Sequence, residues 1–173
     1  KKLLQNYLWK VMKKRKGCTK MKMNKFIKNF DNLTLDFNNF FEMISKGDYK
    51  SSIKNTDILE EQIFKSTFST ENIHSNEFFS PLIQKLADTY QLKNVKLDGF
   101  VFLSFLQGNS GTVHQDEYDV YLYNLFGETL YIVDKEKFIL ETGDLLQIKA
   151  GEVHQAITIK PRLTFSLGVR NDF

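Results

Sequence analysis

At 173 residues, the chain has the length of a single domain that buries roughly two-thirds of its unfolded surface. Hydrophobic residues make up 42% of the sequence, with 16 Phe and 7 Tyr, so a packed core is expected, yet no apolar run approaches the ~20 residues of a membrane span. The single cysteine, Cys18, excludes an internal disulfide framework and favours a reducing, cytoplasmic compartment.

The beginning of the chain carries a strong excess of positive charge. Residues 1–28 contain 11 Lys and Arg and no acid, whereas residues 29–173 hold the other 13 basic residues and all 21 acidic ones, a sum of −8. Apolar residues recur in this stretch at helical spacing, at Leu3, Leu4, Tyr7, Leu8, Val11 and Met12. We therefore predict that residues 1–25 form an arm, made of a basic amphipathic helix that ends at Gly17 and a linker.

Two kinds of contact suit such an arm. Its apolar stripe can pack on the domain itself or on a second copy of the chain, which would make a homodimer. A basic amphipathic helix can also bind nucleic acid, an anionic membrane surface or an acidic protein. The first interpretation is preferred.

Residues 26–93 are predicted to form mainly helical structure that packs on one sheet of the domain. The apolar alternation over residues 33–37 predicts a short edge strand, residues 40–44 a single helical turn, and residues 51–68 a short amphipathic helix. His74 lies in a polar loop without a second type of metal ligand at metal spacing, so we interpret it as a surface residue.

The clearest helix in this part begins at Ser80. Ser80 suits the N-cap position, and Pro81 suits the first helical position. The apolar residues that follow share one helical face: Leu82, Ile83, Leu86 and Tyr90.

After residue 93 the apolar period changes to two, which is typical of β-strands. One strand, or two joined at a kink at Gly99, is predicted over residues 95–106. Further strands are predicted at 118–126, 129–133, 138–140, 145–148, 153–159 and 162–169, with a hairpin at Gly127-Glu128 between the first two of these. Seven or eight short strands separated by Gly- and Asp-containing turns indicate an antiparallel sandwich or barrel.

Two of the three histidines fall between residues 108 and 154, and a further strand is predicted through His114 and Asp116. His114 precedes Asp116 by two residues, and residues i and i+2 of a strand project from the same face. His154 would have to join them from another strand. Two imidazoles and one carboxylate on one face of a metal are the ligand set of non-haem Fe(II) oxygenases. We therefore predict that His114, Asp116 and His154 bind one metal ion.

The spacing around these residues resembles a known family. Gly108-x5-His114-x-Asp116 and Gly143-Asp144-x6-Gly151-x2-His154 look like the two halves of the cupin motif. More narrowly, residues 114–127 resemble the metal-binding strand of the JmjC and cupin-like 2-oxoglutarate oxygenases, and residues 165–170 are similar to the closing strand of their bacterial ribosomal-oxygenase branch.

The resemblance covers roughly residues 95–170, and it implies a mainly β fold. The fold would be a double-stranded β-helix, also called a cupin or jelly-roll barrel, with its core in residues 94–170. One domain would then span residues 26–173, with the helices of residues 26–93 packed on one sheet. The resemblance further implies Fe(II) as cofactor, 2-oxoglutarate as co-substrate, and hydroxylation of a protein or peptide side chain or of a small metabolite.

The sequence departs from the family at the residue that binds the distal carboxylate of 2-oxoglutarate. In many relatives a basic residue stands two positions after the hairpin glycine, where this chain has Thr129. Other 2-oxoglutarate oxygenases place an Arg on the last strand with a hydroxyl residue two positions later, which Arg162 and Thr164 match. Strand parity puts Ser166 on the same face. Arg170 shares this parity further along, and Lys149 is a weaker candidate.

Two other functions compete with an oxygenase. The chain can be a cupin-type metalloenzyme that does not use 2-oxoglutarate, such as an isomerase or another dioxygenase. It can also be a non-catalytic cupin binding module whose basic arm is the functional part. Succinate production separates the oxygenase from both, and metal content separates these two from each other.

Overall fold

The computed structural model describes residues 25–46, 67–108 and 111–171. The predicted arm helix lies outside the described residues. So does the helix predicted over residues 51–68, except that its last two residues begin strand β2 (Thr67–Glu71). No helix of the described residues is long and apolar enough to cross a membrane.

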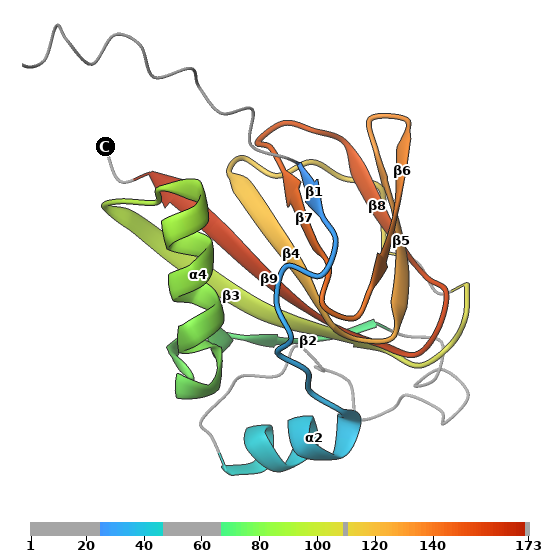
Figure 1. Ribbon diagram of the computed structural model, residues 1–173. Helices are drawn as coiled ribbons and strands as arrows, with labels where there is room; N and C mark the ends of the chain where they lie inside the picture. Colours follow the sequence, from blue (N-terminus) through green and yellow to red (C-terminus); the bar gives the residue numbers. More distant parts are fainter. Residues whose placement is uncertain (1–24, 47–66, 109–110, 172–173) are drawn as a thin grey trace, which may run out of the picture.

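The described strands form two antiparallel sheets that face each other (Figure 1). The larger sheet has the order β1-β7-β4-β9-β3-β2; its remaining strands are β1 (Phe26–Ile27), β3 (Val95–Ser104), β4 (Asp119–Phe126), β7 (Leu145–Ile148) and β9 (Arg162–Asn171). The smaller sheet has the order β6-β5-β8, with β5 (Glu128–Val133), β6 (Glu136–Glu141) and β8 (His154–Thr158). The predicted mainly β, double-stranded β-helix architecture is confirmed.

A hydrophobic cluster joins the facing sides of the two sheets. Its buried members come from β4 and β7 on one side and from β5 and β6 on the other: Val120, Leu122, Leu146, Ile148, Tyr131, Val133 and Leu140. Burying these side chains removes apolar surface from water and fixes the separation of the sheets. A cavity borders this cluster on the side of β8 and β9.

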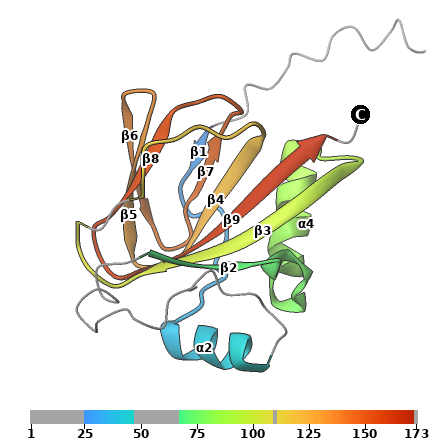
Figure 2. The same ribbon diagram turned by 180° about the vertical axis from the view of Figure 1, so that it is seen from behind.

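The other face of the large sheet is covered by the helices α2 (Phe37–Lys46) and α4 (Ser80–Tyr90), as Figures 1 and 2 show. Short 3-10 turns at Ile73–Ser75 and Glu77–Phe79 lead into α4. The ring of Phe79 stacks on Phe165 of β9 at 4.6 Å between centroids. The predicted packing of N-terminal helices on one sheet is therefore confirmed.

Strand β9 shows how sequence alternation divides the two faces. Its apolar residues belong to the helix-covered cluster: Leu163, Phe165, Leu167 and Val169. The alternate residues, Arg162, Thr164 and Ser166, consequently point toward the smaller sheet, where all three are buried. A register over ten residue pairs with β3 holds the strand in this orientation.

The edge strand predicted over residues 33–37 is wrong. Asp36 caps a helix instead: its carboxylate accepts the N–H of Asn39 at 2.8 Å and its carbonyl accepts the N–H of Phe40 at 2.9 Å. Helix α2 consequently starts at Phe37 and is longer than the single turn predicted.

The helix predicted from Ser80 is confirmed, with one difference at its start. Ser80 itself has helical φ and ψ angles of −55° and −44°, so it is not the N-cap residue. A side-chain cap lies one turn earlier, where Asn76 accepts the N–H of Phe78 at 2.9 Å. Leu82, Leu86 and Tyr90 are buried as predicted.

The hairpin predicted at Gly127 is also wrong, because β4 and β5 belong to different sheets. A register irregularity between Asn124 and Phe126 disturbs the ladder, and Gly127 follows with a φ of +80°. A Cβ atom on Gly127 would lie 1.8 Å from the carbonyl oxygen of Pro161. Glycine is required here because the chain crosses between sheets in close contact with the turn before β9.

His74 is half-buried rather than a free surface residue. Its Nδ1 accepts the backbone N–H of Gly99 at 2.9 Å. Strand β3 runs through Gly99 without a break, and a Cβ atom there would lie 2.6 Å from the Cβ of His74. The glycine therefore permits the close approach of the 3-10 turn to β3 and does not mark a kink.

Candidate metal centre

The two histidines of the motif lie side by side on neighbouring segments. His114 belongs to an extended segment between β3 and β4, and His154 is the first residue of β8. Their backbones exchange hydrogen bonds of 3.1 and 2.8 Å. The strand predicted through His114 and Asp116 is wrong, because His114 forms only an isolated bridge with β8, flanked by the bonds Gly111 N–H to Ala156 O and Gly108 N–H to Thr158 O.

The candidate ligand atoms of His114, Asp116 and His154 all lie within 4.8 Å of one another. We call these three residues the His-Asp-His triad. Asp116 Oδ2 is 3.5 Å from Nε2 of His154, and the two imidazole centroids are 4.3 Å apart. His154 is buried, Asp116 is half-buried and His114 is exposed, so the triad is open on the side of His114.

Backbone carbonyls fix the tautomer of both histidines. Nδ1 of His114 is 2.8 Å from the carbonyl oxygen of Thr112, and Nδ1 of His154 is 3.1 Å from that of Glu152. A carbonyl oxygen can only accept, so we assign the proton to Nδ1 in each ring. The lone pair of each Nε2 is then free for a metal, which is how outer hydrogen bonds commonly orient ligating histidines.

The triad lines a cavity of about 290 Å³ between the two sheets. Arg162 and Ser166 of β9 line the same cavity. Its other walls are mostly apolar and come from β3, β4, β5 and β8: Phe100, Phe102, Val120, Leu122, Tyr131 and Ala156. A mostly apolar cavity with a few convergent polar groups is the usual form of a small-molecule site.

Arg162 is a buried cation surrounded by neutral groups. It is 3% exposed, and it donates to the hydroxyls of Thr158, Tyr131 and Thr164 at 3.3, 3.2 and 3.0 Å. The hydroxyl of Thr164 extends this network by donating a hydrogen bond to Oδ1 of Asn124 at 2.9 Å. No carboxylate of the described residues lies within ion-pair distance of Arg162, so an anionic ligand would relieve the cost of burying this charge.

Thr129 lies beside this network with its hydroxyl unused. It faces the cavity side of β5, as Tyr131 does, and pairs across the sheet with Thr158, one of the partners of Arg162. Its Oγ1 is buried and has no hydrogen-bond partner among the described residues. Thus Thr129, where the family resemblance implied a basic residue, has a short side chain, and its cross-strand partner Thr158 accepts a hydrogen bond from the guanidinium of Arg162.

Arg170 and Lys149 do not reach the cavity. Arg170 is exposed, donates to Asp98 at 3.1 Å and lies 4.4 Å above the ring of Tyr118. Its hydrogen bond with Tyr118 and the nearby carboxylates raise the pKa of Arg170 further. Lys149 pairs with Asp119 at 2.7 Å. Both cations already have partners, so neither is an open anchor for a ligand.

The polar network contains three residues that the sequence analysis missed. Asn124, Tyr131 and Thr158 all belong to it, and the sequence does not identify any of them as a partner of Arg162. The period-two pattern that places Thr129 on the inner face of β5 also places Tyr131 there. For Asn124 and Thr158 the sequence carried no comparable signal, because their partners come from another strand.

No family model matches this chain, and no curated protein matches it. Among solved structures, it is similar to YcfD, a ribosomal oxygenase from Escherichia coli, in complex with cobalt and succinic acid. The TM-score is 0.67, at 17% sequence identity over 86% of this chain and 48% of YcfD. A YcfD complex with cobalt and 2-oxoglutarate gives a TM-score of 0.63, also at 17% identity, over 87% of this chain and 46% of YcfD.

KdgF from a Halomonas species matches a smaller part, with a TM-score of 0.41 and 26% identity over 44% of this chain and 70% of KdgF. The chain spans about half the length of YcfD. The predicted resemblance to the JmjC and cupin-like oxygenases is therefore confirmed at the level of the fold.

Proposed function

We propose that the chain is an Fe(II)- and 2-oxoglutarate-dependent oxygenase that hydroxylates a protein or peptide side chain or a small metabolite. The observation that carries this proposal is the composition of one cavity. The His-Asp-His triad lines it together with Arg162, a buried cation that has no carboxylate partner among the described residues. One part of the cavity suits a metal ion and the other suits a carboxylate.

The triad fits a divalent metal such as Fe(II). Each histidine offers a neutral Nε2, and Asp116 offers a carboxylate, so the three residues supply one negative charge and three ligand atoms. Two imidazoles and a carboxylate on one face leave the opposite positions open for further ligands. His114 is the exposed member, so the open positions are expected to be reached from its side.

Arg162 is the proposed anchor for the distal carboxylate of 2-oxoglutarate. A guanidinium binds a carboxylate through charge and through parallel N–H donors. Ser166 lines the same cavity and offers a hydroxyl to this carboxylate, whereas Thr164 holds the guanidinium of Arg162 through its hydrogen bond. The buried hydroxyl of Thr129 does not line the cavity, and we assign it no direct contact with the ligand. The cofactor and co-substrate, when bound, supply oxidative chemistry in which O2 and 2-oxoglutarate yield succinate, CO2 and a hydroxylated C–H position.

The similarity of fold to YcfD supports this function. The YcfD complexes contain cobalt with succinic acid or with 2-oxoglutarate. We assign a metal ion and 2-oxoglutarate to the cavity of this chain. The substrate is set by the loops and surfaces around the cavity, which differ among proteins of one fold.

Metal stoichiometry and succinate formation test the proposal. The wild-type chain should bind one Fe(II) or Mn(II) per molecule, and Asp116→Ala should abolish this binding, as measured by elemental analysis after gel filtration. Unchanged metal content in Asp116→Ala would refute the triad. A wild-type protein that binds metal but neither binds 2-oxoglutarate nor forms succinate would instead be a cupin of another kind. One that binds no metal would be a non-catalytic module.

A further inference from the structure

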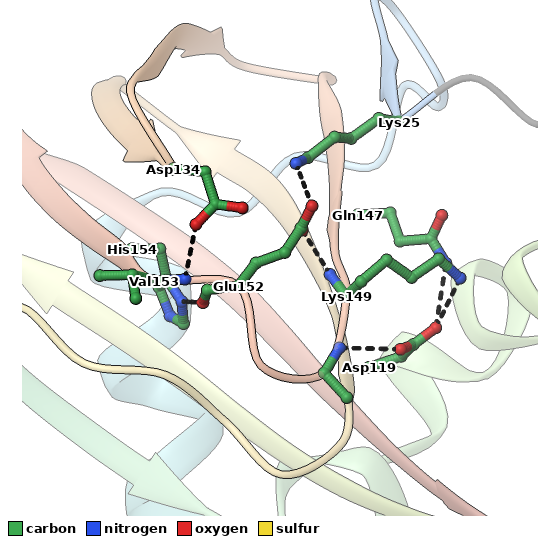
Figure 3. Close-up of polar contacts among 9 residues, drawn as sticks. Lys25, Asp119, Asp134, Gln147, Lys149, Glu152, Val153 and His154 are labelled. Carbon is green, nitrogen blue, oxygen red and sulfur yellow. Dashed lines mark hydrogen bonds and ion pairs between the residues drawn. The ribbon is translucent and has the colours of Figure 1, made fainter.

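The loop that carries His154 is held by an unusually complete set of hydrogen bonds (Figure 3). It joins β7 to β8, and all six consecutive backbone N–H groups from residue 149 to residue 154 have a partner. The acceptors, in order, are the carboxylate of Glu152 (2.7 Å), the carboxylate of Asp119 (3.0 Å), the carbonyl of Asp116 (2.8 Å), the carbonyl of Lys149 (3.0 Å), the carboxylate of Asp134 (3.0 Å) and the carbonyl of His114 (2.8 Å).

This loop contacts every member of the triad. The N–H of Gly151 donates to the carbonyl of Asp116, and the N–H of His154 donates to the carbonyl of His114. The carbonyl of Glu152 accepts a hydrogen bond from the Nδ1–H of His154. Connecting loops are usually the mobile parts of a domain. Because this loop is hydrogen-bonded to all three candidate ligands, the interactions that fix the loop also fix the distances within the triad.

Glu152 is the central residue of this loop. One carboxylate oxygen accepts the N–H of Lys149, which closes the turn, and the other accepts Nζ of Lys25 at 2.7 Å. The side chains of Lys25 and Glu152 are 31% and 22% exposed, so the pair is partly shielded from solvent. Figure 3 shows Lys25 reaching Glu152 from the N-terminal segment, on the far side of the loop from His154.

Lys25 is delivered to this position by strand pairing. Its carbonyl accepts the N–H of Gln147 at 2.7 Å, and the next two residues pair with β7 as strand β1. This register places the Lys25 side chain near the end of β7, where the loop begins. Lys25 was assigned to the end of the arm from the sequence, but it contacts the domain.

We propose that Lys25 and Glu152 are positioning residues for the metal centre, which together form a latch between the N-terminal segment and the triad. This inference rests on the proposed metal binding. Docking of β1 brings Lys25 to Glu152, the Glu152 carboxylate closes the turn, and the Glu152 carbonyl orients the imidazole of His154. Metal affinity therefore depends on a residue of the N-terminal segment that does not touch the metal.

A neighbouring ion pair provides a matched control. Lys28 follows β1 and pairs with Asp144 at 2.8 Å and with Glu141 at 2.9 Å. It ties the same N-terminal segment to the turn between β6 and β7, at the opposite end of β7 from the loop that carries His154. Removing Lys28 thus tests whether the loss of any ion pair of this segment is sufficient to weaken metal binding.

The experiment compares the full-length wild type with Lys25→Ala, Lys25→Arg, Glu152→Ala and Lys28→Ala. Three measurements are made: the dissociation constant for Mn(II), the visible spectrum of the Co(II) form, and amide hydrogen exchange of residues 149–154 in metal-free protein. The spectrum reports ligand geometry, which a purely global change in stability does not alter. Hydrogen exchange reports the loop without any metal.

Glu152→Ala should weaken Mn(II) binding about 10-fold, the lower end of the range for removing a direct outer partner of a metal ligand, because the Glu152 carbonyl that orients His154 remains. Lys25→Ala should weaken it about fivefold and Lys25→Arg less, because the ion pair is partly exposed. Both alanine variants should change the Co(II) spectrum and accelerate exchange in residues 149–154. Lys28→Ala should leave all three unchanged, apart from any loss of global stability.

Two results would overturn the latch. One is unchanged Mn(II) affinity, Co(II) spectrum and loop exchange in both Lys25→Ala and Glu152→Ala. The other is an equal loss in Lys28→Ala, which would assign the effect to overall stability. If the wild type binds no metal, the proposed function fails by itself, and the hydrogen-exchange comparison still decides whether Lys25 holds the loop.

Discussion

Replacing Arg162 by Ala tests the assignment of the co-substrate site most directly. Arg162 is 3% exposed at the start of β9, and its Nε and Nη1 donate to three hydroxyls rather than to a carboxylate. The substitution removes the cation and leaves those hydroxyls and the triad in place. We therefore expect it to weaken 2-oxoglutarate binding while the metal affinity barely changes.

The magnitude follows from the cost of a buried charge without a partner. Breaking a buried, hydrogen-bonded charge pair typically costs ~3–5 kcal/mol, because the remaining charge stays buried. At ~1.4 kcal/mol per decade, this corresponds to roughly two to four orders of magnitude in the dissociation constant. The loss should fall in the lower part of this range, because the hydroxyls of Thr158 and Thr164 remain to solvate a bound carboxylate.

Anaerobic calorimetric titration of 2-oxoglutarate into the Mn(II) protein measures this effect. Arg162→Lys keeps the charge but loses the planar fork, so its affinity should lie between those of the wild type and Arg162→Ala. Arg170→Ala is the exposed control and should bind as the wild type does. Unchanged affinity in Arg162→Ala would refute the reasoning. A large loss confined to Arg170→Ala would move the anchor to the end of β9.

Three further predictions concern the fold. Deleting residues 1–20 should leave the domain folded by circular dichroism and change its oligomeric state or partner binding; cooperative loss of structure would make this segment part of the core. Gly127→Ala should lower the free energy of urea unfolding by ~3 kcal/mol or more, since it combines backbone strain with a Cβ placed 1.8 Å from a carbonyl oxygen. Gly108→Ala, with the same φ of +80° and no atom within 4 Å of its Cβ, should cost only ~1 kcal/mol. Burial alone raises the pKa of Asp31, but hydrogen bonds from Lys85 and two backbone N–H groups outweigh burial and hold that pKa below its ordinary value. The unfolded chain therefore takes up the proton first as pH falls, so this contribution to stability is complete above pH ~4–5 and is lost toward the folded pKa. In Asp31→Asn, the free energy of urea unfolding should decline less than in the wild type as pH falls over that range. An identical decline in the two proteins would contradict the assignment.

The residues of the candidate metal centre and the alternation of the strands could be derived from the sequence alone. Spacing within one strand is a local property, so the parity of Arg162, Thr164 and Ser166 was available before their neighbours were known. The same holds for α4, where a proline at the start and a 3.6-residue period are both local signals. The strand around Asp116 was wrongly predicted, although its grouping with the histidines was right. A side chain can reach a site from an isolated bridge as well as from a continuous strand.

Which strands share a sheet, and which groups hold the triad, became clear only in three dimensions. Gly127 resembles a hairpin glycine in sequence, but β4 and β5 separate because each finds its hydrogen-bond partners elsewhere in the chain. Asp36 was placed in a strand because its neighbours alternate, whereas its cap of α2 depends on the helix that follows. The ion pair between Lys25 and Glu152 spans 127 positions of sequence. No local period encodes such a contact, because it arises only when β1 has docked on β7 and brought the two side chains together.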